Sequence, residues 1–404
     1  MTKIVPFKAI RACRDKAHLV ATRSYLTYSA STLKEKLNNN PFTFLHVINP
    51  NNNENKKINF TEKCKLVRKK LNDFIKSKYL IKDKQKSFYI YQQTDKEKSY
   101  IGIIAGISIE DYNNNIIKIH EETIAERENL FKKYLDITNF NADPVLLTYK
   151  KNININNIIN KVQRSRAEYE FTTTDKILHK LWLVNNLKDI NNLILEFKKI
   201  NNIYIADGHH RTASSSLLHK KIKKTEKNNC NYFMSYLISE DQISIRNFNR
   251  LITLKRNLNK NNLLNKIKDD FNIINTKYRK PNKQNEIGMY YENKYYLLIP
   301  KSKIISKNPL ERLDPYILSQ KILKPILRIK NERTNKSISF LSGKISFDEI
   351  KKMADKKQNS IVFILQPVTI NNIKEVADNN KIMPPKSTYI EPKLRSGLII
   401  YPIK

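Results

Sequence analysis

Glycine is scarce in this chain, which has only six glycines among 404 residues. No Gly-x-x-x-x-Gly-Lys-Ser/Thr string occurs, so a Walker A phosphate loop is excluded. The Gly-x-Gly-x-x-Gly fingerprint of Rossmann dinucleotide sites is absent as well. The chain therefore lacks both of the best-known glycine-rich nucleotide loops.

Cysteines and long apolar runs are also few. The three cysteines, Cys13, Cys64 and Cys230, are isolated and lack metal-ligand spacing, which predicts reduced thiols rather than a disulfide framework. The segment Met1–Ile10 has no apolar h-region, and the longest apolar stretch, Ile101–Ile109, is far too short to span a membrane. With 40% hydrophobic residues the chain can bury a good core. We expect a cytoplasmic protein of two or three domains without a membrane partner.

Acidic residues are outnumbered by basic ones, 38 to 75, which gives a formal net charge of +37. Such a charge ordinarily suggests a nucleic-acid partner. Here the lysines are spread along the whole chain and accompany an excess of Asn and Ile, the residues of A/T-rich codons. This distribution favours base drift over a selected basic face. We therefore do not expect nucleic acid as a partner, although a functional polyanion site remains the alternative.

Strand-like and helix-like segments alternate, which predicts an α+β, or mixed α/β, fold. The expected strands are Phe88–Gln92, Tyr100–Ile109 and Ile116–His120 as a meander, Ile203–Ala206, Asn231–Ile238 paired with Gln242–Ile252, and Ser360–Pro367. The expected helices are Asp189–Ile200, Thr212–Lys220, a surface excursion within Lys255–Lys283, one opened by the capping box of Ser346 and Glu349, and one beginning at Thr369. We expect an N-terminal and central region, 1–284, and a C-terminal region, 285–404.

The segment Ala206–Ser215, Ala-Asp-Gly-His-His-Arg-Thr-Ala-Ser-Ser, breaks sharply from the Lys/Asn/Ile background. It follows a predicted strand and opens a predicted helix, and a helix N-terminus is a ready anion site. Glycine permits close approach of the backbone to a phosphate, arginine offers a bidentate fork, and aspartate can hold Mg²⁺ or accept a proton. The residues of interest are Asp207, Gly208, His209, His210, Arg211 and Thr212.

Two other interpretations of this loop exist. In the first, Asp207 simply caps the helix, Gly208 makes the turn, and the two histidines are solvent-exposed or pack against neighbouring residues. A structural zinc site is disfavoured, because adjacent histidine side chains diverge and no His/Cys/carboxylate partner stands at standard spacing.

Two further constellations stand out. The first is His120-Glu121-Glu122-Thr123, whose carboxylates could serve as a general base or a metal ligand. The alternative is a helix N-terminus where acidic residues are favoured by the helix dipole. The second is the proline-locked basic segment Met383–Gly397, in which Lys386, Lys393 and Arg395 can reach a phosphate or carboxylate. A rigid closing segment without a binding role is the alternative.

Together these motifs resemble the family of unknown function numbered 1015 over the full length of the chain. The resemblance is carried by Val5-Pro6-Phe7-Lys8-Ala9, His120-Glu121 with Thr123, Asp143-Pro144-Val145, Tyr204 to Arg211, Asn231-Tyr232-Phe233-Met234, and Met383 to Thr388 through Gly397. The chain departs from the branch that it most resembles at Asn331, where Asp is expected before Glu332-Arg333-Thr334, and at Ser342-Gly343, where Gly-Gly is expected.

The Asp-Gly-His-His-Arg loop is in turn similar to the Asp-Gly-His-x-Arg loop of free serine kinases. That resemblance implies a ParB/sulfiredoxin-like nucleotide-binding core with additional α/β elements, and transfer of phosphate from ATP or ADP, with Mg²⁺, to a small hydroxy amino acid such as L-serine. It implies Asp207 and Glu121 as catalytic carboxylates, Asp207 as the metal ligand, and a phosphate-binding loop of Gly208, His209, His210, Arg211 and Thr212. Lys386 and Arg395 are then candidates for holding the carboxylate of the acceptor.

Two functions of other classes share this sequence pattern. The same loop in ParB-type proteins implies a nucleotide-operated regulator or DNA-binding protein without kinase activity. A non-catalytic scaffold in amino-acid metabolism is the third possibility. Fold analogy does not choose among them.

Overall fold

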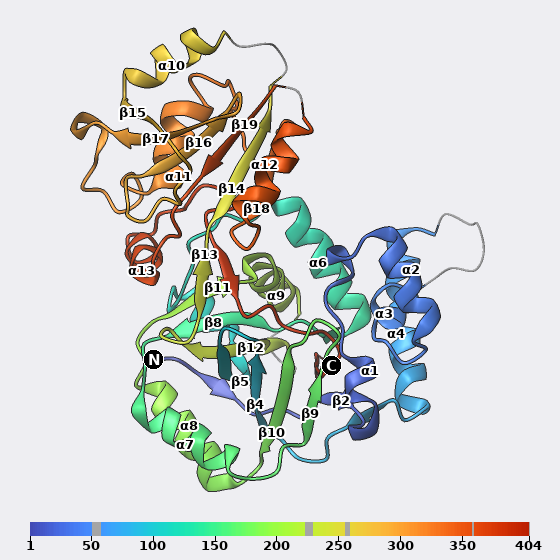
Figure 1. The fold of residues 1–404 in the computed structure, drawn as a ribbon. Helices are drawn as coiled ribbons and strands as arrows, with labels where there is room; N and C mark the ends of the chain where they lie inside the picture. The colour runs from blue at the N-terminus through green and yellow to red at the C-terminus, as the bar shows by residue number, and fades with distance from the viewer. Residues whose placement is uncertain (51–57, 223–228, 255–258, 358, 404) are drawn as a thin grey trace. The chain divides into compact units, whose positions relative to one another are not determined.

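The computed structural model describes residues 1–50, 58–222, 229–254, 259–357 and 359–403. It confirms the mixed α/β fold, with helices and β-sheets interleaved along the chain (Figure 1). Contacts divide the chain into two compact units. Unit 1 comprises Met1–Lys118, Thr123–Ile243 and Pro392–Lys404, and unit 2 comprises Ile119–Glu122 and Ser244–Glu391.

Unit 1 is built on a large mixed sheet in the order β6-β11-β8-β12-β5-β4-β10-β9, with β1 also paired to β5. Within this sheet β11 runs parallel to β6 and β12 runs parallel to β8, and the other described pairs are antiparallel. The strands are β1 (Ile4–Val5), β4 (Phe88–Thr94), β5 (Ser99–Ser108), β6 (Ile117–Lys118), β8 (Val145–Tyr149), β9 (Tyr169–Thr172), β10 (Leu178–Val184), β11 (Ile203–Asp207) and β12 (Tyr232–Ser239).

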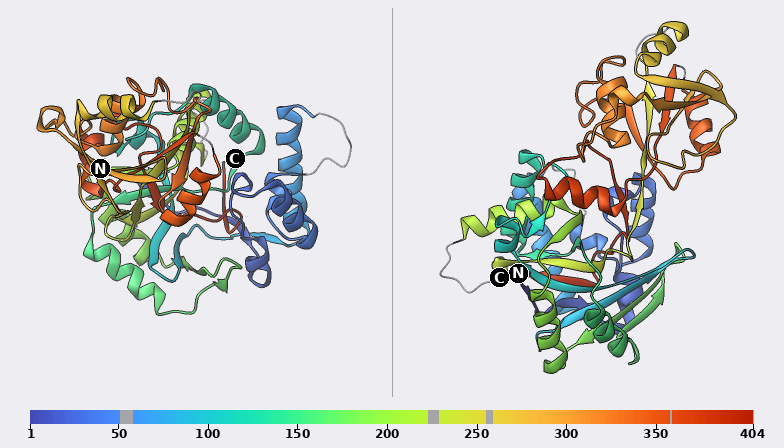
Figure 2. Two further views of the ribbon diagram at one scale, coloured as in Figure 1. Left: turned by 45° about the horizontal axis from the view of Figure 1, so that its top comes forward. Right: turned by 90° about the vertical axis from the view of Figure 1, so that its left-hand side faces the viewer.

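A smaller sheet in unit 1 has the order β3-β2-β21-β7, with strands Leu80–Lys82, Ile10–Ala12, Ile399–Pro402 and Phe140–Asn141. It joins the two ends of the chain, because β2 and β21 are antiparallel neighbours. The helices of unit 1 are α1 (Ala17–Val20), α2 (Ala30–Asn39), α3 (Leu45–Ile48), α4 (Phe60–Lys76), α5 (Ile109–Asn113), α6 (Ala125–Thr138), α7 (Ile153–Gln163), α8 (Leu187–Lys198) and α9 (His209–Lys221). Helix α9 packs against β8, β12 and α6, and α7 packs against α8 (Figures 1 and 2).

Local sequence explains several of these elements. In α8 the residues Ile190, Leu193 and Phe197 are buried at helical spacing, so one face of the helix is apolar. The side chain of Asn186 caps this helix by accepting hydrogen bonds from two backbone N–H groups of its first turn. The β4–β5 hairpin turns at Asp95, whose side chain accepts the backbone N–H groups of the two residues before the return strand.

Unit 2 contains an antiparallel sheet in the order β15-β17-β16-β19-β14-β18 and a separate strand pair, β13 with β20. The strands are β13 (Ser244–Arg246), β14 (Phe248–Thr253), β15 (Phe271–Thr276), β16 (Ile287–Tyr291), β17 (Lys294–Pro300), β18 (Ile338–Ser342), β19 (Ser360–Ile364) and β20 (Tyr389–Glu391), and the helices are α10 (Lys260–Lys268), α11 (Asp314–Leu318), α12 (Phe347–Asp355) and α13 (Ile370–Asp378).

Neighbouring residues along a strand of this sheet belong to two different apolar clusters. Ile252 and Phe363 pack with residues of α10 and α11, whereas their neighbours Leu251 and Val362 pack with residues of α12. Adjacent residues of a strand point to opposite faces, so both faces of the sheet are covered.

Two expected strand pairings are wrong. The segment after β5 does not continue a meander, since the helical turn α5 intervenes and β6 pairs with β11 instead. The segment Gln242–Ile252 forms two strands, β13 and β14, and neither pairs with β12, whose partners are β5 and β8. A period-2 pattern identifies a strand without identifying its partner. Here the chain passes from unit 1 to unit 2 at Ile243/Ser244, within the second expected strand.

The other sequence expectations have mixed outcomes. The capping box of Ser346 and Glu349 and the helix start at Thr369 are confirmed. The polar segment Lys255–Lys283 contains α10, as expected, and also strand β15, while residues 255–258 lie outside the described residues. The boundary placed at 284/285 falls inside unit 2, between β15 and β16.

Gly102 provides a test of the central β4-β5-β12 region. A Cβ atom at this position would lie 2.5 Å from the carbonyl oxygen of Leu237 and 2.8 Å from ring atoms of Tyr236. We predict that Gly102→Ala lowers the free energy of unfolding by about 1–3 kcal/mol, because the rigid neighbours must move. Urea denaturation followed by circular dichroism measures this. Gly106→Ala on the same strand is the matched control, since its nearest neighbour is a valine methyl group at 3.0 Å; equal losses for the two variants would contradict the packing argument.

Candidate phosphate-binding site

Asp207 lies at the end of β11, between parallel β6 and antiparallel β8. The register of the β11–β8 pair shifts between Ile205 and Asp207, and such a bulge re-aims the side chains that follow it. The Asp207 side chain retains 41% of its accessible surface. Its carboxylate is therefore open to solvent at the point where the sheet gives way to α9.

Gly208 makes the turn from β11 into α9. Its φ of +109° lies in a region that other residues rarely adopt, and a Cβ atom here would lie 3.0 Å from two nitrogens of the Arg211 guanidinium. Gly208 supplies no side-chain cap to α9. The N-terminus of α9, which carries a partial positive charge, therefore lies beside Asp207 and receives no capping side chain from Gly208.

Two cations flank the Asp207 carboxylate. Lys393 Nζ donates a hydrogen bond to Asp207 Oδ2 at 2.9 Å, and Arg211 Nη2 lies 3.9 Å from the same oxygen. Desolvation alone would raise the pKa of Asp207, but the charges of Lys393 and Arg211 outweigh it and lower the pKa to about 2. The carboxylate is ionised at neutral pH and is a weak base.

The remaining loop residues are more enclosed. Arg211 Nη1 donates to the carbonyl oxygen of Pro144 at 2.6 Å, which fixes its guanidinium above the loop. His209 is 5% exposed and Thr212 is fully buried. The hydroxyl of Thr212 donates to the carbonyl oxygen of Gly208 at 3.3 Å. The predicted phosphate-binding residues thus share one turn, with Arg211 more exposed than His209 and Thr212.

The segment Pro392–Leu398 carries Lys393 to this loop and is held by several contacts. Ser396 exchanges two backbone hydrogen bonds with Thr22, of 2.8 and 3.2 Å, and its hydroxyl donates to the carboxylate of Asp143. Arg395 Nη2 donates to both carboxylate oxygens of Asp175, at 2.7 and 2.5 Å.

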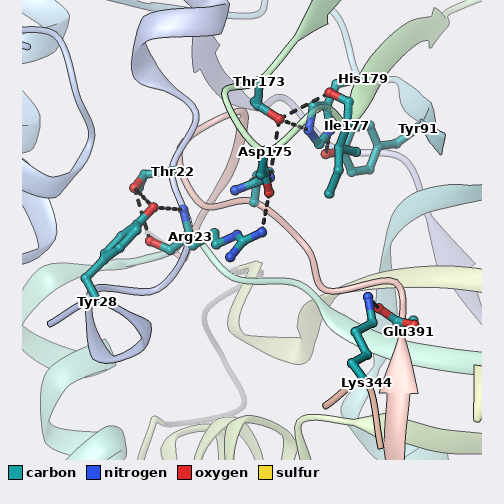
Figure 3. A network of polar contacts seen from close by, with 11 residues as sticks. Thr22, Arg23, Tyr28, Tyr91, Thr173, Asp175, Ile177, His179, Lys344 and Glu391 are labelled. Atoms are coloured by element: carbon teal, nitrogen blue, oxygen red, sulfur yellow. Dashed lines mark hydrogen bonds and ion pairs between the residues drawn. The ribbon is translucent and has the colours of Figure 1, made fainter. Parts of the chain in front are cut away.

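Asp175 is the centre of a polar network (Figure 3). Arg23 also pairs with its carboxylate. Burial opposes ionisation of Asp175, but hydrogen bonds and the two arginines hold its pKa well below the ordinary value. Nearby, His179 Nδ1 lies 2.8 Å from the Tyr91 hydroxyl, and burial followed by the charge of Arg395 lowers the histidine pKa to about 3. His179 is therefore neutral at physiological pH.

Arg395 was a candidate for holding the acceptor's carboxylate. Its side chain is 5% exposed and is paired with Asp175, so the guanidinium is committed to an intramolecular contact here. That binding role stays a prediction.

The metal expected at Asp207 can be tested against the residues present. Among the described residues no group of three or more His, Cys, Asp or Glu side chains could hold a metal ion. Mg²⁺ is commonly bound through one or two carboxylates, with substrate phosphates and water completing the shell. Asp207 fits that mode as a single protein ligand, and it does not fit a site made by the protein alone.

Glu121 and Lys386, two other candidates, lie in unit 2. The carbonyl oxygen of His120, next to Glu121, accepts the backbone N–H of Met383 at 2.9 Å. The guanidinium of Arg333 donates to the carbonyl oxygen of Glu122 at 2.8 Å. The structure thus brings together three segments that the sequence singled out: the His-Glu-Glu-Thr segment, the Glu-Arg-Thr segment and the Met-Pro-Pro-Lys-Ser-Thr segment.

Arg250 is a residue of this unit 2 cluster that the sequence did not indicate. Its side chain is fully buried, with Nε 3.8 Å from Glu332 Oε2 and Nη2 3.4 Å from the carbonyl oxygen of Pro385. The guanidinium also lies 5.3 Å from the ring centroid of Phe340. Lys386 adopts a positive φ of 56°, and its Nζ lies 5.3 Å from the ring centroid of Phe248. No local motif marks Arg250, because its partners are distant in sequence.

The chain belongs to the family described as protein of unknown function (DUF1015), whose model matches residues 4–316. A search of the curated proteins finds no match. Within the part of the chain that the structure describes, no helix is long and apolar enough to cross a membrane.

Solved structures show a distant likeness. C-terminally truncated SbnI from Staphylococcus aureus is 12% identical, with a TM-score of 0.42 over 74% of this chain and 87% of that one. A free serine kinase in complex with AMP is 14% identical, with a TM-score of 0.39 over 75% and 91% of the two chains. A conserved hypothetical protein from Pyrococcus furiosus is 13% identical, with a TM-score of 0.37 over 74% and 95%. The ParB/sulfiredoxin-like core remains an expectation from the sequence.

We predict that Asp175→Asn destabilises unit 1 by about 1–2 kcal/mol, because it removes the counter-ion of the buried Arg395 while Asp175 itself is partly exposed. The lowered pKa means that Asp175 stabilises the fold above its ordinary value of 3.8 and that this contribution falls as the pH drops below that value. Melting temperatures between pH 7 and pH 2 should therefore fall less steeply for the variant than for the wild type.

The matched control is Asp73→Asn on α4, a carboxylate of the same unit without an ion pair among the described contacts. Parallel pH profiles for the wild type and Asp175→Asn would show that the Arg395 contact does not stabilise the fold.

Proposed function

We propose that this protein is a phosphotransferase that uses ATP or ADP to phosphorylate the hydroxyl group of a small amino acid, with L-serine as the first candidate. The observation that carries the proposal is the Asp207 carboxylate held between Lys393 and Arg211 at the start of α9. The choice of serine comes from the resemblance of the Asp-Gly-His-His-Arg loop to that of free serine kinases.

The loop has the charge that a phosphate requires. Two cationic side chains face one carboxylate, and the N-terminus of α9 adds a partial positive charge. Gly208 lacks a side chain, so the Arg211 guanidinium lies close to the backbone of the turn. Arg211 is fixed by its bond to Pro144, which prepares its guanidinium for a phosphate without further ordering.

Phosphoryl transfer depends mainly on positioning and on neutralising charge. The acceptor oxygen would bond to the terminal phosphorus while the bond to the bridging oxygen breaks, releasing ADP from ATP or AMP from ADP. Asp207 would hold Mg²⁺, which when bound neutralises charge on the phosphate oxygens. With a pKa of about 2, Asp207 is suited to holding a cation rather than to accepting the hydroxyl proton. The resemblance to free serine kinases implies Glu121 as the acceptor of that proton, and this role stays a prediction.

The test is to incubate the purified protein with L-serine, Mg²⁺ and either ATP or ADP, and to follow O-phosphoserine by phosphorus NMR. We expect product from the wild type, and a turnover lower by roughly two orders of magnitude for Asp207→Ala and for Arg211→Ala, because each loses a charge at the transferring phosphate. Asp73→Asn should match the wild type.

Unchanged turnover in either loop variant would remove that residue from the mechanism. Nucleotide binding without phosphoserine, tested also with other hydroxy amino acids, would favour the nucleotide-operated regulator. A DNA-binding form of that regulator would lose affinity for DNA steeply as salt concentration rises.

A further inference from the structure

Lys393 occupies Oδ2 of Asp207, one of the two carboxylate oxygens that a divalent cation could bind. Its Nζ lies 2.9 Å from Oδ2, closer than the Arg211 guanidinium at 3.9 Å. An ammonium group and a metal ion on the same carboxylate repel each other, so each weakens the binding of the other. The geometry therefore sets Lys393 and the metal in competition for Asp207.

The backbone that carries Lys393 is anchored, whereas its side chain is not enclosed. Arg395 and Ser396, two and three residues further on, are tied to Asp175 and to Asp143. The Lys393 side chain keeps 44% of its accessible surface, so its flexible stem can swing while the attachment point stays beside the loop.

The charges around Asp207 determine which group the Lys393 ammonium contacts after a metal ion has displaced it. Asp207 is one anion between two cations, so a metal ion added without a phosphate would place three cations around one carboxylate. A nucleotide brings several negative charges with its metal, and the displaced lysine then finds a stronger partner than the carboxylate that it left.

We propose that Lys393 acts as an exchangeable counter-ion: it holds Asp207 when the site is empty, yields that oxygen to a divalent cation, and then contacts a phosphate of the bound nucleotide. This inference rests on the proposed nucleotide binding for its second half. It gives a defined role to Lys393, which the sequence offered only as one of three basic residues able to reach a phosphate or carboxylate.

The proposed exchange predicts that one variant binds a metal ion more tightly and a nucleotide more weakly than the wild type does. Lys393→Met keeps most of the length of the side chain and removes the charge. Without nucleotide, Mn²⁺ should bind the variant about tenfold more tightly than it binds the wild type, because the competing cation is gone; electron paramagnetic resonance of free Mn²⁺ measures this. At saturating Mg²⁺, ADP should bind the variant about tenfold more weakly, measured by calorimetry, because the variant lacks the charged contact to phosphate that the displaced lysine makes.

Three controls make the result specific. Lys393→Arg should stay close to the wild type in both measurements, since it keeps a cation. Lys393→Met combined with Asp207→Asn should lose the gain in Mn²⁺ affinity, which assigns the gain to Asp207. Lys69→Met, an exposed lysine on α4, should change neither affinity.

Unchanged Mn²⁺ affinity in Lys393→Met would overturn the competition at Asp207, and unchanged ADP affinity would overturn the contact to phosphate. Wild-type protein that binds neither ADP nor ATP would overturn the proposed function and the phosphate contact with it. The Mn²⁺ comparison needs no nucleotide, so it still decides whether Lys393 and a metal compete for Asp207.

Discussion

The candidate site depends on the return of the chain to unit 1 through Pro392–Leu398. Three side chains of this segment bind three carboxylates that are distant in sequence: Lys393 binds Asp207, Arg395 binds Asp175 and Ser396 binds Asp143. The segment continues into β21, which pairs with β2 and β7. Sheet pairing and charge pairing thus constrain the same stretch of chain. The position of the ammonium beside Asp207 follows from both.

The local features of the fold were readable from the sequence. Apolar spacing located α8, and the polar residues that cap helices located the starts of α12 and α13. The strand-to-helix turn at Asp207-Gly208 was expected and is found between β11 and α9. These features depend on residues within one or two turns of each other, so the pattern alone contains the information.

What the sequence could not provide was the pairing of distant segments. The partner of β6 is β11, some 85 positions further along the chain, and Arg250 finds Glu332 and Pro385 only through the fold of unit 2. From the sequence, all three basic residues of Met383–Gly397 can reach a phosphate or carboxylate, and Lys386 and Arg395 are the candidates for holding the acceptor's carboxylate. The structure separates them, since Lys386 lies in unit 2 over Phe248, Arg395 is buried against Asp175, and Lys393 contacts the loop.

Scarcity of glycine makes the remaining glycines informative. At most positive-φ positions this chain uses another residue, often asparagine, as at Asn115, Asn139 and Asn293, with φ near 60°. That value is the left-handed minimum that asparagine tolerates. The two glycines with positive φ have values of 109° and 87°, outside that minimum, and they are Gly208 and Gly397. One turns the chain into α9, and the other directly follows the residues that reach Asp207, Asp175 and Asp143. Backbone geometry that only glycine adopts easily is therefore kept at both segments that build the loop site.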